Sequence, residues 1–377
     1  MTDQDLQTLP LDALHRELGG KMVSFAGYSM PVQYPMGVKG EHLHVREKAG
    51  LFDVSHMGQA YLSVEQGEHE QVARLIEELV SAEIVKLGKG RIRYTVLLNE
   101  EGGILDDLMV TRLPDQDGKL FLVVNAAVKE QDFALIGETL GGRAKLDVLD
   151  RCLLALQGPL AHTVLSALDP MAAEMPFMSM RETQLDGIPV MLSRCGYTGE
   201  DGYEISVANS DAERLARRLL AHDDVAPIGL GARDSLRLEA GLCLYGHDMT
   251  PEDTPVSAGL NFAIGKRRRE EGGFPGAERI IRELHEGTDT LRVGLKPLGR
   301  VPAREGAEVQ SEDGETIGKV TSGGFGPTYE APVAMGRIDT KHAEPGTKVR
   351  ILVRGKPLEA EVVKLPFVEQ RYYRGKK

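Results

Sequence analysis

The sequence contains no tryptophan, only three cysteines, and no apolar run approaching the roughly 18 residues that a membrane-spanning helix needs. Cys152, Cys195 and Cys243 are far apart and form no CxxC pair, which disfavours a disulfide framework and favours free thiols in a reducing compartment. Positive charge is also scarce, because 45 Lys and Arg stand against 57 Asp and Glu, a net charge of −12. This balance argues against nucleic acid or an anionic membrane as the main partner. We therefore expect a cytoplasmic protein.

Leader segments and metal-ligand spacings are missing as well. The first residues, MTDQDLQTLPLDALHRELGG, are acidic early and lack an Arg-rich and Ser-rich amphipathic pattern, so neither a signal peptide nor a transit peptide is predicted. His42, His44 and His56 could be metal ligands, but no HExxH motif or Cys/His cluster accompanies them. Structural or surface roles are favoured for these histidines, and no metal is expected.

The chain of 377 residues is long enough for two or three domains, and 41% hydrophobic with 27% charged residues is typical of a soluble globular protein. Up to about residue 287, strand-like runs alternate with single amphipathic helices such as 69–83 and 211–222, which indicates an α+β body. From 288 onward, short strands recur between Gly-rich or Pro-rich turns, a rhythm typical of a β-barrel or sandwich. We expect a separate β domain there.

Two adjacent carboxylates lie in the second of three strand-like runs, RIRYTVLL (91–98), ILDDLMVTR (104–112) and KLFLVVNA (119–126), which predict an antiparallel meander. Side chains alternate along a strand, so Asp106 shares a face with Leu108 and Asp107 shares the other with Met109. An ionised Asp in such an apolar run is costly unless it is paired. The pair is either a structural carboxylate near a turn or a reacting group, and alternation alone does not say which face is the site.

A second carboxylate candidate is Glu204 in GYTGEDGYE (196–204). Along a strand its side chain would point to the face opposite that of Tyr203 and Ile205. It is either part of a solvated strand face or an acceptor for a paired N–H edge, such as that of an aminopyrimidinone ring. Tyr197 in the same turn could stack or hydrogen-bond on such a ring.

The segment GLGARD (229–234) predicts a cation directly ahead of a helix, with Arg233 before the helix and Asp234 or Ser235 as its cap. A cation beside a helix N-terminus favours a carboxylate or phosphate ligand. The segment is not a dinucleotide-binding fingerprint, because Asp234 occupies the third Gly position. Ser55 and Cys195 likewise lack the surroundings of a catalytic nucleophile.

Nine stretches in the same order resemble the aminomethyltransferase (T-protein) family of the glycine cleavage system: GKMVSFAGYSMPVQY, REKAGLFDVSHMG, YTVLLNEEGGILDDLMV, VVNAA, LALQGP, SRCGYTGEDGYEIS, GLGARDSLRLEAG, LYGHDM and TSGGFGPT. The resemblance implies two interleaved folate-binding α/β domains, about 1–50 with 146–287 and 51–145. A C-terminal β-barrel, 288–377, would complete a clover-leaf arrangement around a central opening.

The resemblance also implies a reaction. A one-carbon unit would pass from the aminomethyl-dihydrolipoyl arm of H-protein to tetrahydrofolate, with release of ammonia and formation of 5,10-methylenetetrahydrofolate. The place of Asp107 in its matching motif implies that it is the catalytic residue. Folate-binding roles would fall to Met57, Tyr94, Asn125, Tyr197, Glu204, Arg233 and Arg374, with Arg371 as the alternative to Arg374.

Some positions depart from the family pattern, and some interpretations stay open. Tyr28 stands where the family usually has Trp, and Phe177 lies in a segment whose aromatic residues commonly line the folate pocket. The basic segments HLHVREK, GKRRRE and RYYRGKK are either patches for an acidic H-protein or solvated charged faces. The alternative functions are another folate-dependent demethylase and a non-catalytic folate-binding scaffold.

Overall fold

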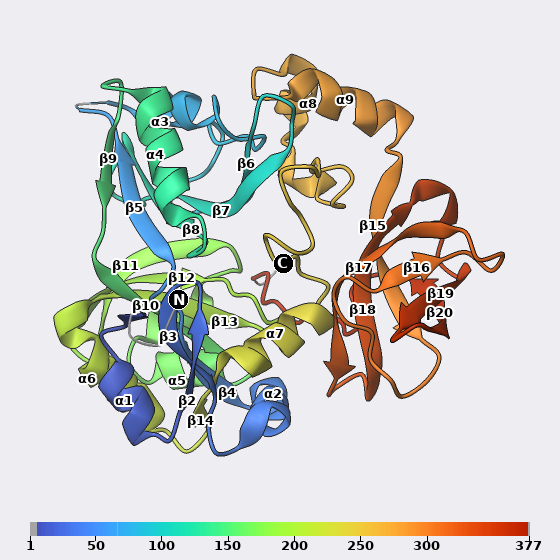
Figure 1. Cartoon of the computed structure of the whole chain (residues 1–377). Helices are drawn as coiled ribbons and strands as arrows, with labels where there is room; N and C mark the ends of the chain where they lie inside the picture. Colours follow the sequence, from blue (N-terminus) through green and yellow to red (C-terminus); the bar gives the residue numbers. More distant parts are fainter. Residues whose placement is uncertain (1–5, 66, 376–377) are drawn as a thin grey trace.

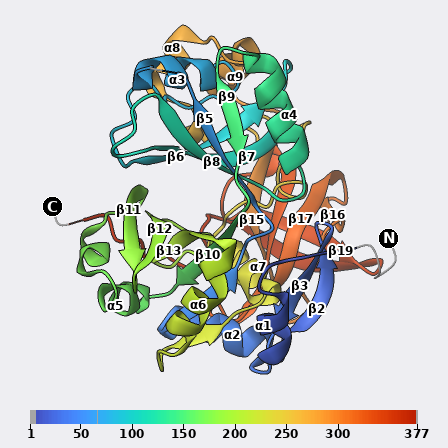
Figure 2. The same ribbon diagram turned by 90° about the vertical axis from the view of Figure 1, so that its left-hand side faces the viewer.

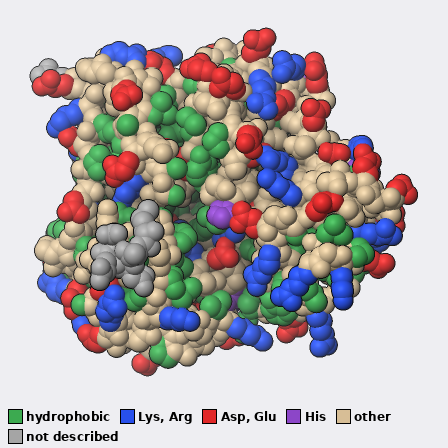
Figure 3. All heavy atoms as spheres, in the orientation of Figure 1, with side chains coloured by type: hydrophobic (Ala, Val, Ile, Leu, Met, Phe, Trp, Pro, Cys, Tyr) green, Lys and Arg blue, Asp and Glu red, His purple; other side chains and the backbone are tan. Residues whose placement is uncertain are grey.

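In a computed structural model that describes residues 6–65 and 67–375, the chain forms three lobes (Figure 1). Two lobes are each built on an open sheet, and the third is a closed barrel. The surface is hollowed where the three lobes meet (Figure 3). None of the helices among the described residues is long and apolar enough to cross a membrane.

The first lobe, at the lower left of Figure 1, contains a six-stranded sheet with the order β11-β12-β13-β10-β4-β14. These strands span Ala49–Asp53 (β4), Arg151–Gln157 (β10), Ser179–Leu185 (β11), Ile188–Arg194 (β12), Gly202–Ala208 (β13) and Val225–Pro227 (β14). The small sheet β1-β3-β2 belongs to the same lobe, with Gln7–Thr8, Tyr28–Gln33 and Lys21–Phe25. The surrounding helices are Asp12–Glu17 (α1), Gly37–Glu47 (α2), Ala161–Ser166 (α5), Pro170–Glu174 (η1), Asn209–Leu220 (α6) and Leu230–Glu239 (α7).

The second lobe contains a five-stranded sheet with the order β6-β7-β8-β5-β9. Its strands span Gly58–Ser63 (β5), Ile92–Leu98 (β6), Ile104–Arg112 (β7), Lys119–Val124 (β8) and Lys145–Val148 (β9), so the predicted meander is confirmed. The helices on this side are His69–Ile76 (α3), Lys129–Leu140 (α4), Asn261–Ala263 (η2), Lys266–Glu271 (α8) and Ala277–Glu286 (α9). Helix α3 ends earlier than the predicted 69–83. The Glu77 carboxylate accepts hydrogen bonds from the backbone N–H groups of Ile84 and Val85, which folds the chain back.

The third lobe is a closed barrel with the order β15-β18-β17-β16-β19-β20. Its elements are Thr290–Pro297 (β15), Glu308–Gln310 (β16), Thr316–Gly326 (β17), Ala331–Asp339 (β18), Thr340–His342 (η3), Lys348–Val353 (β19) and Lys356–Val363 (β20). Inward-facing side chains such as Leu295, Val320 and Ile351 are fully buried and fill its core. The change of character near residue 288 therefore marks the beginning of the barrel.

The first two lobes are interleaved in sequence, as Figure 2 shows from the side. The chain leaves the six-stranded sheet after β4, forms the five-stranded sheet, and returns with β10. These crossings lie a few residues beyond the boundaries at 50 and 146 expected from the sequence. Backbone hydrogen bonds from Ile92 N to Met178 O (3.0 Å) and from Met180 N to Gly90 O (2.8 Å) join the two lobes. One buried apolar cluster contains residues of both sheets, including Phe52 and Phe121.

After β20 the chain leaves the barrel and returns to the first lobe. The backbone N–H groups of Phe367 and Val368 donate to the carbonyl of Glu239 at 2.9 and 3.0 Å. Arg371 N then donates to Gly199 O at 2.8 Å, and the Tyr373 carbonyl accepts from Phe177 N at 2.7 Å. The last described residues therefore pack against the first lobe, and Figure 2 shows the C-terminus at the edge of the molecule.

Candidate active site between the lobes

The strand that carries the two adjacent carboxylates begins at a glycine pair, and the packing there explains why. A Cβ atom on Gly103 would lie 1.8 Å from the carbonyl oxygen of Pro251, and Gly102 has a positive φ of 79°. This close approach lets Ile104 N donate to Asp253 O at 2.9 Å. The segment after α7 is thereby held against the start of β7.

The two carboxylates of β7 face opposite sides of the sheet. Asp106 is fully buried on the core face, where Leu108 and Val110 are also buried. Asp107 is partly exposed on the other face. Asn125, just after β8, connects them: its N–H and Nδ2 donate to Asp106 at 3.0 and 2.9 Å, and its Nδ2 also donates to Asp107 Oδ1 at 2.8 Å. Of the pair, Asp107 is the one that a ligand could reach.

The surroundings of Asp107 keep its proton affinity high. Burial raises the pKa of this carboxyl, the neighbouring charge of Asp106 raises it further, and hydrogen bonding from Tyr94 and Asn125 lowers it in part. Burial and the charge of Asp107 in turn raise the pKa of the Tyr94 hydroxyl, so this group stays a neutral donor. A carboxyl in such a setting can take up and release a proton near neutral pH.

The other wall of the site comes from the six-stranded sheet and α7. Glu204 on β13 is partly exposed while its neighbours Tyr203 and Ile205 are fully buried, as the alternation predicted. Burial raises the pKa of Glu204, and the charge of Arg233 lowers it in part. The Cys195 thiol donates to Glu204 Oε2 at 3.4 Å. Within the described residues, Glu204 Oε1 has no hydrogen-bond partner and remains available as an acceptor.

Arg233 and Tyr197 lie together on this wall. The Arg233 guanidinium stands 4.9 Å from the centre of the Tyr197 ring, a cation–π contact. The Tyr197 hydroxyl donates to the carbonyl oxygen of Cys243, so it is held by the backbone. Burial lowers the pKa of Arg233, and the part of the chain that the structure describes offers its guanidinium no hydrogen bond or ion pair. An accessible, unpaired guanidinium in this position favours an anionic or carbonyl-bearing ligand.

The local prediction for the start of α7 was wrong. Arg233 lies in the first turn of α7, which begins at Leu230 after Gly229, and neither Asp234 nor Ser235 caps the helix. The Glu41 carboxylate instead accepts from Gly229 N at 2.8 Å, so the helix start is fixed by a buried side chain from α2. The cation remains close to the helix N-terminus, but within the helix.

The C-terminal segment separates the two arginines that the sequence left open. Arg371 donates to Glu200 Oε1 at 2.6 Å and to the carbonyl of Arg46 at 2.7 Å, so its charge is paired with a buried carboxylate although its side chain is exposed. Arg374 is exposed, and no hydrogen bond or ion pair of its side chain occurs among the described residues. Between them, the Tyr372 ring stacks on Phe177 with a centroid distance of 4.0 Å. Phe177 is therefore engaged by the chain's own tyrosine.

One aromatic residue at the site was not predicted. Phe262 on η2 is 69% exposed, and its ring stacks on that of Tyr94 with a centroid distance of 5.7 Å. Phe262 thus adds an exposed apolar ring beside Tyr94, whose hydroxyl is hydrogen-bonded to Asp107. The sequence gives no local signal for it, because Phe262 lies in an irregular segment far from β6.

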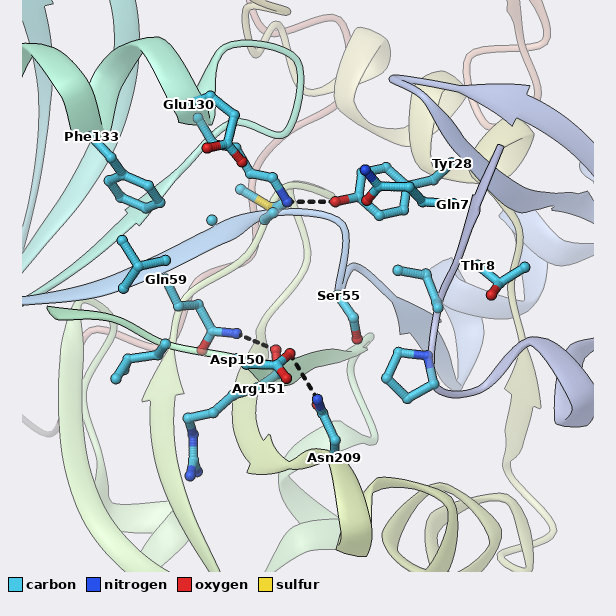
Figure 4. Close-up of a pocket in the computed structure, with 17 residues that line it drawn as sticks. Gln7, Thr8, Tyr28, Ser55, Gln59, Glu130, Phe133, Asp150, Arg151 and Asn209 are labelled. Atoms are coloured by element: carbon cyan, nitrogen blue, oxygen red, sulfur yellow. Dashed lines mark hydrogen bonds between the residues drawn. The ribbon is translucent and has the colours of Figure 1, made fainter. Parts of the chain in front are cut away.

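A separate cavity of about 470 Å³ lies at the seam of the first two lobes (Figure 4). It is lined by Tyr28, Gln59 and Arg151 among others, and Lys129 Nζ donates to the Tyr28 hydroxyl at 2.6 Å. Met57 is the only residue of the predicted site that lines it. Asp107 and Glu204 do not line this cavity. Met57 itself follows His56, whose pKa is lowered first by burial and then by the charge of Arg233.

The predicted basic patch HLHVREK is not a cationic surface, whereas GKRRRE keeps exposed cations at Lys266 and Arg269. In HLHVREK, His42 and Arg46 are buried against Glu239, and in GKRRRE, Arg267 pairs with Glu77 and Glu83. Arg268 of GKRRRE is buried too. The last two residues of RYYRGKK lie outside the described residues. In its described part Arg371 and Arg374 are both exposed, and Arg371 is paired with Glu200. Among the described residues of the three segments, exposed cations without an ion pair therefore remain at Lys266, Arg269 and Arg374.

Among the described residues, no group of three or more His, Cys, Asp or Glu is arranged to hold a metal ion. Ser55 contacts Asp53 at 2.5 Å and Asp53 contacts His15 at 2.8 Å, so the carboxylate stands between serine and histidine. A nucleophilic triad needs the histidine in the middle.

Two family models match the chain, the GCVT N-terminal domain over residues 11–268 and the glycine cleavage T-protein C-terminal barrel domain over residues 291–369. The mitochondrial aminomethyltransferases of Dictyostelium discoideum and Flaveria anomala are 43% and 45% identical to it, over 98% and 99% of this chain and 94% and 92% of their own lengths. The crystal structure of the glycine cleavage system aminomethyltransferase T from Bartonella henselae matches with a TM-score of 0.92 and 44% identity, covering 98% of this chain and 99% of that one.

Proposed function

Since the chain belongs to the aminomethyltransferase (T-protein) family of the glycine cleavage system, we propose that the site between its two open sheets carries out that family's reaction with Asp107 as the catalytic carboxylate. The activity is that of a tetrahydrofolate-dependent aminomethyltransferase. It transfers the one-carbon unit of the aminomethyl-dihydrolipoyl arm to tetrahydrofolate, releases ammonia and gives 5,10-methylenetetrahydrofolate. The demethylase and scaffold alternatives are not favoured by relatives of this name and coverage.

The observation that carries the catalytic assignment is the opposite orientation of the two β7 carboxylates. Asp107 faces the site while Asp106 is buried. The folate nitrogen that attacks the transferred carbon gains positive charge and must lose a proton, and the departing amine must gain one. The ionised Asp107 stabilises the developing cation, and its raised pKa suits it to pass the proton on. Such assistance is typically worth about 10² to 10⁴ in rate.

We assign the pterin ring to the wall formed by β13 and α7. The free Glu204 oxygen fits a ring edge that presents paired N–H groups, and Arg233 fits a ring carbonyl or carboxylate. Tyr197 offers its ring to the ligand, since its hydroxyl is held by a backbone carbonyl. Met57, Tyr94 and Asn125 would bound the folate on the side of the five-stranded sheet.

Three further assignments concern the donor, the C-terminal arginines and the location. We propose lipoylated H-protein as the donor, since that is the carrier of the aminomethyl arm in the family's reaction. Arg374 is our choice over Arg371 for a ligand-facing cation, because the charge of Arg371 is already paired with Glu200. A cytoplasmic location stays our proposal; its support is that Cys152, Cys195 and Cys243 are unpaired thiols.

The test mixes the protein with tetrahydrofolate and H-protein charged with the aminomethyl arm, and measures ammonia and 5,10-methylenetetrahydrofolate. We expect both products in equal amounts. Asp107→Asn should bind tetrahydrofolate with little change, by calorimetric titration, while kcat falls about 10² to 10⁴-fold. No product from the wild-type protein with a competent H-protein would refute the function, and a fully active Asp107→Asn would refute the assignment.

A further inference from the structure

Behind Asp107 lies a third carboxyl group that the proposed reaction does not use. Asp132, in the first turn of α4, is 2% exposed and packs against the core face of β7. Its carboxyl is in hydrogen-bonding contact with that of Asp106. Asp132 Oδ2 is buried and has no hydrogen-bond partner among the described residues. Three aspartates, two of them fully enclosed, are thus grouped around Asn125.

No cation balances the enclosed pair. In the part of the chain that the structure describes, Asp106 accepts from the N–H and Nδ2 groups of Asn125, and neither Asp106 nor Asp132 forms an ion pair. The other titratable groups that act on this pair are Asp107 on β7 and Tyr245 in the segment after α7. On α4 itself, the Lys129 ammonium is turned away, since it donates to the Tyr28 hydroxyl and the His56 carbonyl.

Two buried carboxylates in contact without a cation cannot both be ionised, so one of them keeps a proton. Asp106 already accepts two N–H groups of Asn125, which stabilise its ionised form. Asp132 has no such donors. Burial and the adjacent charge of Asp106 therefore raise the pKa of Asp132 well above the ordinary Asp range, and the shared proton belongs to it.

The proton on Asp132 matters because Asp106 holds the Asn125 amide in place. With Asp132 donating to it, Asp106 stays ionised and fixes the Asn125 amide with its NH₂ group toward both β7 carboxylates. That NH₂ group is also the donor that orients Asp107, at 2.8 Å from Oδ1 and 3.1 Å from the Asp107 carbonyl.

We propose that Asp132 is a positioning residue, which as a neutral acid donates a hydrogen bond to the ionised Asp106 and so holds Asn125 and the Asp107 carboxylate in the reactive arrangement. This proposal rests on the function assigned above. It identifies a third carboxyl group in the site, one that acts only through its neighbours and does not contact the substrate.

The experiment compares Asp132→Asn, which keeps an N–H donor toward Asp106, with Asp132→Leu, which keeps volume and has none. Glu138→Gln, exposed on the same helix, is the control. We expect Asp132→Leu to lower kcat by about tenfold or more, the effect of losing a hydrogen bond to a charged group, with a nearly unchanged KM for tetrahydrofolate. Asp132→Asn should keep kcat within about threefold, a smaller loss because its amide still donates to Asp106.

Two readings separate this role from simple packing. Wild-type kcat should fall at alkaline pH as Asp132 ionises beside Asp106, and Asp132→Asn should lack that fall. Infrared difference spectra at neutral pH should show a protonated-carboxyl band in the wild type that Asp132→Asn loses and Glu138→Gln retains. The spectra need no substrate, so they test the proton on Asp132 even if the assigned reaction fails.

The proposal is overturned if Asp132→Asn leaves the protonated-carboxyl band unchanged. It is equally overturned if Asp132→Leu folds with a normal melting temperature and keeps wild-type kcat and pH profile. Should Asp132→Leu fail to fold, the infrared and pH comparisons of Asp132→Asn with wild type decide the question alone.

Discussion

Replacing Glu239 by Gln should weaken the attachment of the barrel and the C-terminal segment to the body. The Glu239 side chain is fully buried at the end of α7. Its carboxylate accepts from Arg46 at 2.9 Å and from the backbone N–H groups of Thr328 and Tyr329 at 2.8 and 3.1 Å, and His42 Nε2 lies 3.0 Å away. Thr328 and Tyr329 belong to the β17–β18 turn of the barrel, so one carboxylate joins two lobes.

The size of the effect follows from the charge. Burial alone would raise the pKa of Glu239. The pKa is instead lowered from an ordinary 4.5 to about 2 by hydrogen bonding and charge from His42, by the Tyr329 N–H and by the charge of Arg46. That difference corresponds to about 3 kcal/mol in favour of the ionised form in the folded state. Removing one partner of a buried ion pair typically costs roughly 3–5 kcal/mol. We therefore expect Glu239→Gln to lower the free energy of unfolding by about 3 kcal/mol at pH 7.

The pH dependence gives the sharper test. Because the folded-state pKa is depressed, the stabilisation is present above about pH 4.5 and is lost as pH falls toward 2. Urea unfolding of wild type and Glu239→Gln should therefore differ at pH 7 and converge in acid, with exposed Glu312→Gln as the control. A difference below about 0.5 kcal/mol at pH 7, the range of ordinary surface substitutions, would refute the reasoning.

Three further predictions concern the site. Glu204→Gln should weaken tetrahydrofolate binding by about tenfold, because the amide presents a donor where a charged acceptor is expected; unchanged affinity by calorimetry would remove Glu204 from the site. The rate should rise with pH through a pKa well above the ordinary Asp value, because Asp107 acts ionised and its pKa is raised; a pH–rate profile flat from pH 5 to 8, which is about the range in question, would contradict this. Arg374→Ala should weaken folate binding without changing the melting temperature, whereas Arg371→Ala should lower the melting temperature through loss of its bond to Glu200; the reverse pattern would exchange their roles.

The sequence predicted the elements around the site better than their orientation. Alternation along 104–112 correctly placed Asp106 and Asp107 on opposite faces. Which face is buried depends on α4, whose Phe133 and Ile136 pack with Leu108 in one core. That helix contacts the strand only in the folded structure, so alternation along the strand alone could not identify the buried face.

The errors arose where distant residues decide a local feature. Asp234 or Ser235 was expected to cap α7, but the helix start is fixed by Glu41 of α2. Arg46 was expected in a surface patch, yet it is buried because Glu200 and Glu239, far along the chain, neutralise it. In each case the partner is more than 150 residues away in sequence, beyond any local pattern.

The returning C-terminal segment has a consequence for biosynthesis. Residues 371–374 are made after both open sheets and the whole barrel, yet Tyr372 and Arg371 are seated on Phe177 and Glu200. Until residues 371–374 have left the ribosome, the first lobe lacks these contacts with Phe177 and Glu200. Competence to bind ligand should therefore arise only after this segment has packed against the first lobe.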